Sequence, residues 1–286
     1  MITVLTEPLT YAFMQRGMMA SVMVGILCAI VGCYVVLRGM AYLGDAISHA
    51  ILPGVAIAYV LKGEILIGAL VAAILVALAI GFLTRHGTIK EDTAIGILFA
   101  ATLSLGVALI STIKTYALDL THILFGNVLG VSQTDLIFIA VLGAVVLLTI
   151  ALLYKELLVI SFDAVLAATL RLPTELLKNI LLVLIALVVV ISLQTVGVGL
   201  VAAMLVTPAA TAYLLTRRLP AMMLVSALCG ALSSIIGLYI SFYLNIVSGA
   251  AIVLTATAFF FLAYLFAPRR GLAWGFLRRA RRVPAA

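Results

Sequence analysis

The sequence predicts an all-α polytopic membrane protein with eight to nine transmembrane helices, and two observations support this prediction. Of 286 residues, 66% are apolar and only 9% are charged, whereas soluble domains carry roughly a quarter charged residues. Apolar runs of about 20 residues recur along the chain, and each is long enough to cross a bilayer as a helix. The alternating ten-residue segments typical of a transmembrane barrel do not occur in the sequence, so we expect a helical bundle.

Nine apolar segments follow one another without an internal repeat or a low-complexity tract. We therefore expect one transmembrane domain over residues 1–286. If the first or second segment is re-entrant rather than spanning, eight crossings remain. The segments are approximately 18–37, 41–61, 64–84, 93–113, 134–154, 176–193, 196–215, 220–243 and 248–267.

The distribution of Lys and Arg predicts the orientation, because cytoplasmic loops retain basic residues. With nine crossings and a cytoplasmic basic tail over 268–286, fourteen basic residues lie inside and three outside, which puts the N-terminus outside. With eight crossings the N-terminus is inside. The net charge of +7 comes largely from basic residues placed like those of a cytoplasmic membrane flank. It therefore does not indicate nucleic-acid binding. The inside set is Arg38, Arg85, Lys90, Lys155, Arg171, Lys178, Arg217, Arg218 and the six tail arginines; the outside set is Arg16, Lys62 and Lys114.

Two connections are too long for plain turns. The outer one, residues 114–135, contains Asp119 and His122. These two residues could help to capture a cation, but an ordinary polar loop is the favoured interpretation. The inner one, residues 154–179, contains Asp163 as a predicted N-cap of a short helix that stops at Pro173. A short helix between the cytoplasmic ends of two spans can dock on a partner protein, or it can simply lie on the membrane surface.

Asp45 is the one acidic residue inside an apolar segment, and His49 follows four residues later in "YLGDAISHAILPG". A carboxylate at membrane depth costs about 2.5–3.5 kcal/mol, so it faces a partner or a water-filled path. Side chains at i and i+4 share a helix face, and these two can both reach one divalent cation. They can equally hydrogen-bond each other as a polar pair. Two ligands are too few for a metal site, but a symmetric homodimer doubles them.

A helix break is predicted just after this pair and recurs later in the chain. Pro53 weakens the helix just past His49, and broken helices are where transporters expose a path. A similar break is predicted at "MLVTPAATA". Residues considered as pathway lining are Ser48, Thr207 and Pro208. We expect the three cysteines to be buried in the packing between helices.

The sequence contains no nucleotide-binding or catalytic motif. Uphill transport would therefore need a partner protein or an ion gradient as its source of energy.

Five segments of the chain resemble the membrane permease subunits of bacterial ABC importers for manganese, zinc and iron. They are "LRGMAYLGDAISHAILPGVAIAY", "KEDTAIGILFA", "ILFGNVLGVS", "ISFDAVLAATLRLP" and "ISLQTVGVGLVAAMLVTPAATAYLL". They occur in the family's order and cover nearly the whole chain.

The resemblance implies a shortened, vitamin-B12-importer-like (type II) permease in the bacterial cytoplasmic (inner) membrane, with the C-terminus cytoplasmic. It implies a homodimer, two cytoplasmic ATPase subunits that hold the ATP, an extracytoplasmic metal-binding protein, and no cofactor or catalysis in this chain. Asp45 and His49 match the family's metal-coordinating pair. The matching ATPase-coupling residues are Ser161, Phe162, Asp163, Ala164, Val165, Leu166, Ala167, Ala168, Thr169, Leu170, Arg171 and Leu172.

The chemical type of the ligand atoms limits which metal ions the chain could transport. Oxygen and nitrogen ligands without thiolate suit Mn²⁺, Fe²⁺ or Zn²⁺. We expect manganese, because two carboxylates let coordination expand toward six, with zinc or iron as alternatives. Binding should weaken as His49 becomes protonated. Two other classes fit the sequence less well. An ion-coupled secondary metal transporter would need a relay of acidic residues within the spans, but only Asp45 is acidic there. An intramembrane metallo-enzyme would need three metal ligands in one chain, whereas Asp45 and His49 supply two.

Overall fold

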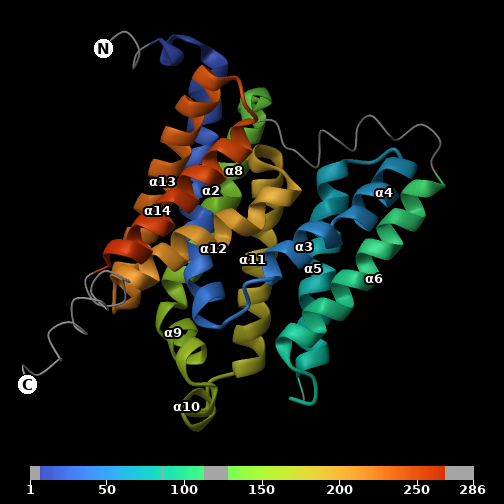
Figure 1. Ribbon diagram of the computed structural model, residues 1–286. Coiled ribbons are helices and arrows are strands. Elements are labelled where there is room, and N and C mark those ends of the chain that lie inside the picture. The colour runs from blue at the N-terminus through green and yellow to red at the C-terminus, as the bar shows by residue number, and fades with distance from the viewer. Residues whose placement is uncertain (1–6, 86, 113–127, 268–286) are drawn as a thin grey trace, which may run out of the picture.

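The computed structural model describes residues 7–85, 87–112 and 128–267. Within these ranges the chain is helical and has no strand, which confirms the predicted class (Figure 1). The helices are η1 (Pro8–Thr10), α2 (Ala12–Leu37), α3 (Leu43–Ala50), α4 (Leu52–Val60), α5 (Ile65–Thr84), α6 (Glu91–Ser111), η2 (Val128–Gly130), α8 (Gln133–Leu152), α9 (Tyr154–Phe162), α10 (Ala164–Thr169), α11 (Thr174–Val196), α12 (Val198–Leu215), α13 (Leu219–Leu244) and α14 (Ser248–Phe266).

Eight helical stretches in the described chain are long and apolar enough to cross a membrane, and a ninth, Val201–Leu215, is shorter. The second span, Leu43–Val60, consists of α3 and α4 together. Figure 1 shows the N-terminal end of α2 and the short helix α10 at opposite ends of the molecule. The count of eight to nine spans therefore agrees with the sequence prediction.

Local differences from the prediction lie at segment ends. Helix α2 begins at Ala12 rather than at residue 18, because its first turn packs on η1 and extends beyond the strictly apolar run. Helix α9, which follows α8 after a one-residue break, was not predicted. Ser132 and Asp135 form a capping box that fixes the start of α8. As predicted, Cys28 and Cys33 are buried, whereas Cys229 is only half-buried; all three cysteines are free.

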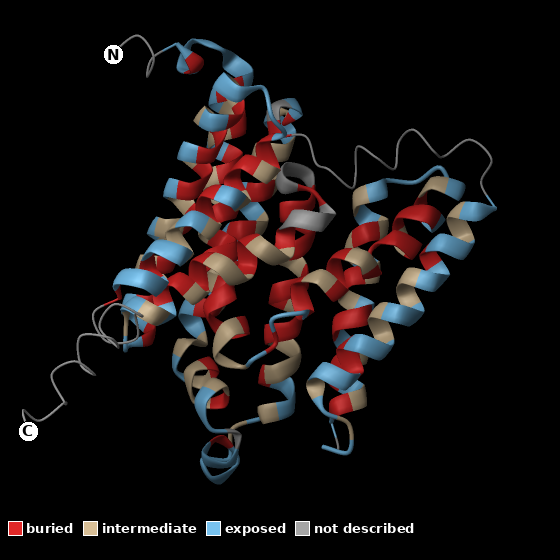
Figure 2. Cartoon of the chain, in the orientation of Figure 1, coloured by how far each residue is buried: buried red, intermediate tan, exposed pale blue. Residues whose placement is uncertain are grey.

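Helix α2 forms the centre of the larger part of the molecule, where α8, α11, α12 and α13 surround it and α14 packs on α12 and α13 (Figures 1 and 2). Gly25 of α2 meets Gly230 of α13 so closely that a Cβ on Gly25 would lie 2.8 Å from the Gly230 carbonyl oxygen. The Ser226 and Ser234 hydroxyls of α13 each donate to a carbonyl of α2 at 2.9 Å. Small residues and interhelical hydrogen bonds replace the hydrophobic effect as the adhesive between helices in lipid.

Helices α3–α6 form a second group beside this bundle (Figure 1). Helix α5 packs along α11, and α3 packs on α11 and α12, so these contacts join the two groups. Gly54 of α4 and Gly68 of α5 face each other at close approach. Helix α6 packs on α3, α4 and α5 and has the smallest buried share of the eight spans. The α3–α6 group is thus held to the bundle mainly through α3 and α5.

Candidate functional site

Asp45 and His49 lie on one face of α3, as the i, i+4 spacing predicted. The Oδ1 atom of Asp45 is 3.6 Å from Nε2 of His49, and their side chains are 43% and 26% exposed. A separation of 3.6 Å is too long for a hydrogen bond. It is short enough for both atoms to contact one cation at about 2.1 Å each. The pair therefore leaves room for a third partner between its two ligand atoms.

The other ring nitrogen of His49, Nδ1, is buried and has no hydrogen-bond partner among the described residues. Phe99 of α6 packs edge-on against the imidazole, with ring centroids 5.5 Å apart. An aromatic neighbour fixes the ring without engaging its nitrogens. No group of three or more His, Cys, Asp or Glu side chains occurs in the described part of the chain. One chain thus offers two ligands in the described structure.

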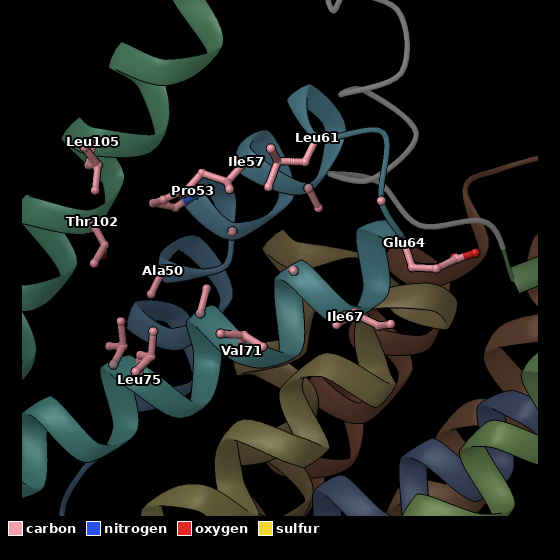
Figure 3. A pocket seen from close by; sticks show the side chains of 16 residues that line it. Ala50, Pro53, Ile57, Leu61, Glu64, Ile67, Val71, Leu75, Thr102 and Leu105 are labelled. Atoms are coloured by element: carbon pink, nitrogen blue, oxygen red, sulfur yellow. The ribbon is translucent and has the colours of Figure 1, made fainter.

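The helix break after this pair is present. Helix α3 ends at Ala50 and α4 begins at Leu52, with Pro53 at its second position, where the missing N–H costs nothing. Beside the break, α4, α5 and α6 enclose a groove of ≈ 590 Å³ that extends from Ala50 to Glu64 (Figure 3). Apolar side chains dominate its walls, with Thr102 and Glu64 as the exceptions. This groove is unsuited to a cation, because almost all of its lining side chains are apolar.

The remaining pathway candidates are less open than Asp45. Ser48 is buried, and its hydroxyl donates to the Gly44 carbonyl at 2.7 Å. The helix break predicted at Pro208 is wrong, because α12 continues from Val198 to Leu215 through this buried proline. Thr207 beside it is half-buried. Asp119 and His122 lie outside the described residues.

Asp163 caps α10 as the sequence predicted: its Oδ1 accepts hydrogen bonds from the backbone N–H of Val165 at 2.9 Å and of Leu166 at 3.0 Å. The helix spans only Ala164–Thr169 and ends before Pro173. It forms an exposed tip at one end of the molecule (Figure 2). Apolar side chains that are exposed on and beside α10 are Phe162, Val165, Leu166 and Leu170.

Because the side chain of Asp163 satisfies two of the N–H groups at the start of α10, we expect Asp163→Ala to loosen this helix. Loss of an N-cap costs about 1 kcal/mol, which is a large share of the stability of a six-residue helix. Hydrogen exchange should accelerate over residues 164–169 while the temperature of global unfolding changes little. Thr149→Val in α8, whose hydroxyl bonds only its own helix, serves as the control. Unchanged exchange in α10 would contradict the prediction.

An ionic cluster that the sequence analysis did not identify lies where α2 ends and α6 and α11 begin. Oε1 of Glu91 is 2.8 Å from Nη2 of Arg38 and 2.8 Å from Nζ of Lys178. Lys178 also donates to Oγ1 of Thr84 at the end of α5, at 2.8 Å. The positive-inside count had placed Arg38 and Lys178 on the same side of the membrane. Their meeting around Glu91 requires the tertiary fold.

A bundle in which eight described helical stretches are long and apolar enough to cross a membrane is that of a multi-pass membrane protein. The chain belongs to the ABC 3 transport family, whose model matches residues 10–267. It is thus the membrane permease of an ABC transporter, as the resemblance implied.

Known proteins resemble the chain over most of its length. The manganese transport system membrane protein MntC of Halalkalibacterium halodurans is 48% identical over 264 residues, covering 92% of this chain and 90% of the relative. The solved structure of PsaBC from Streptococcus pneumoniae in complex with Fab matches with a TM-score of 0.85 and 42% identity, covering 97% of this chain and 100% of that chain. A metal-chelate type ABC transporter in an inward-facing conformation matches at a TM-score of 0.69 and 18% identity, over 87% and 85% of the two chains, and shows the shared fold.

Proposed function

We propose that this chain is the pathway-forming permease subunit of an ATP-driven importer of divalent transition-metal ions, with manganese as its substrate. The observation that supports this most directly is the pair of Asp45 and His49, whose ligand atoms stand 3.6 Å apart within a broken span. An acidic residue inside a span costs stability unless it serves a site or a pathway.

The proposed metal site needs a second copy of the chain. One chain supplies a carboxylate and an imidazole, and a twofold axis beside α3 would bring two of each together. Asp45 remains 43% exposed in the single chain, which leaves it accessible to a symmetric partner. Four ligands from two chains would also make binding reversible, because rotation of the two copies would separate the pairs and release the ion.

The energy for transport would come from a partner ATPase. Helix α10 would dock on it through the exposed side chains of residues 161–172, since a capped, rigid tip with apolar residues suits insertion into a groove. This assignment makes the α10 end cytoplasmic and places the protein in the cytoplasmic (inner) membrane, with lipid around the spans. A separate metal-binding protein would deliver the ion to the opposite end.

Manganese is favoured over zinc and iron by two arguments. Carboxylate and imidazole ligands without thiolate suit Mn²⁺, and two carboxylates allow coordination to expand toward six. The relative with 48% identity carries the name of a manganese transport system. Zinc or iron import by the same architecture is the alternative, since both ions accept the same ligand types.

Uptake in cells that lack their own manganese importer tests the proposal. The chain is expressed with its ATPase and metal-binding protein, and uptake of ⁵⁴Mn²⁺ and ⁶⁵Zn²⁺ is compared at equal concentration. We expect manganese uptake that requires the ATPase and persists when an uncoupler collapses the proton gradient. Uptake that survives without the ATPase and stops with the uncoupler would instead indicate an ion-coupled secondary transporter. Preferential zinc uptake would retain the architecture and overturn the assignment of manganese.

A further inference from the structure

We propose that Glu91 is a positioning residue for transport: its contacts with Arg38 and Lys178 form a clamp that carries movement of the α10–α11 segment to the helices around the metal site. This inference rests on the proposed function and assigns to the three residues a role in coupling ATP hydrolysis to transport. The three residues are called the Glu91 clamp below.

The Glu91 clamp joins elements that helix packing leaves apart. Helix α6 packs on α3, α4 and α5, whereas α2 and α11 belong to the larger bundle. At the first residue of α6, one oxygen of Glu91 accepts from both Arg38 and Lys178 at 2.8 Å. The clamp therefore ties α6 directly to the bundle.

Lys178 is well placed to transmit movement of α10. It lies on the second turn of α11, which begins at Thr174, five residues after α10 ends. Its ammonium group also donates to Thr84 at the end of α5. A shift of the start of α11 would therefore pull on the ends of α5 and α6 together.

Helix α6 extends the connection to the metal site. Phe99 lies eight residues beyond Glu91, about 12 Å along the same helix. Its ring packs edge-on against His49 at 5.5 Å between centroids. A helix is rigid over this distance, so displacement at Glu91 reaches the imidazole as a change in its support. The connection is thus contiguous from Lys178 to His49.

The hydrogen-bonding groups of the Glu91 clamp are not all paired. One carboxylate serves two cations, and the side chains of Arg38, Lys178 and Glu91 are only 13%, 17% and 26% exposed. A second terminal nitrogen of Arg38, Nη1, is buried without a partner among the described residues. A buried donor without an acceptor is costly, and such sites occur where strain or an alternative arrangement has a function. If the contact were only structural, we would expect every N–H group of Arg38 to have an acceptor.

The test measures metal transport and ATP hydrolysis in the same reconstituted complex. Glu91→Gln removes the charge and keeps the shape of the side chain. We expect this variant complex to assemble and to hydrolyse ATP, while manganese transported per ATP falls about tenfold or more. Adding Lys178→Gln should cause little further loss, because both substitutions break the same contact. Arg85→Gln is the matched control: its partner Glu175 lies 3.6 Å away, both side chains are largely exposed, and transport per ATP should stay within about twofold.

A normal transport-to-ATP ratio in Glu91→Gln would overturn the proposal, and so would failure of this variant to assemble, because the clamp would then only hold the fold. A second readout does not depend on metal transport. Hydrogen exchange at the start of α6 should change when ATP is added to the wild-type complex and should not change in Glu91→Gln. If the wild-type complex transports no manganese, the proposed function fails, and the exchange comparison still decides the role of the clamp. Equal responses in both proteins would refute that role.

Discussion

Replacing Asp45 with asparagine is expected to abolish manganese uptake while the transporter still assembles. The substitution keeps the volume of the side chain and one oxygen, but it removes the negative charge that holds a divalent cation. In a symmetric complex the charge is lost twice. Loss of a group that merely supports a metal ligand costs 10–100-fold, so loss of a ligand itself should lower uptake about 100-fold or more. Cells expressing the variant with its partners are assayed for ⁵⁴Mn²⁺ uptake, and assembly is checked by co-purification of the ATPase.

Glu64→Gln provides the control for the Asp45 experiment. Glu64 is an exposed carboxylate at the start of α5 in the same group of helices, and it borders the apolar groove rather than the Asp45–His49 pair. Its uptake should match the wild type. Full uptake by Asp45→Asn, or by His49→Ala, in an assembled complex would mean that the pair is a structural contact and that the ion is selected elsewhere.

The sequence predicted those features that depend on local pattern. Apolar length located the spans, and the i, i+4 spacing placed Asp45 and His49 on one helix face before their separation was known. The acidic residue at Asp163 located the start of α10, because capping is decided within a few residues. Each of these inferences needed only the geometry of a single helix.

Features that depend on which helices meet were not predictable in the same way. Arg38, Glu91 and Lys178 are far apart in sequence, and each alone is an ordinary charge at the end of a span. The part-buried contacts around Glu91 arise because three helix ends converge. Helix α9 was missed for a different reason: its mixed residues have no strong apolar period, and packing against α2, α8 and α11 stabilises it.

Gly32→Ala is expected to destabilise the chain strongly, because α2 crosses α12 there with the two backbones almost in contact. A Cβ on Gly32 would overlap the carbonyl oxygen of Leu205 and reach Ala209 at 3.4 Å. A backbone atom cannot rotate away, so the helices must separate, at a cost of about 1–3 kcal/mol or more. Gly96→Ala in α6, which meets open space, should leave the melting temperature of the detergent-purified chain unchanged or slightly raised, since alanine favours helix. Equal melting of Gly32→Ala and wild type would mean that this crossing tolerates separation and does not set the packing of α2.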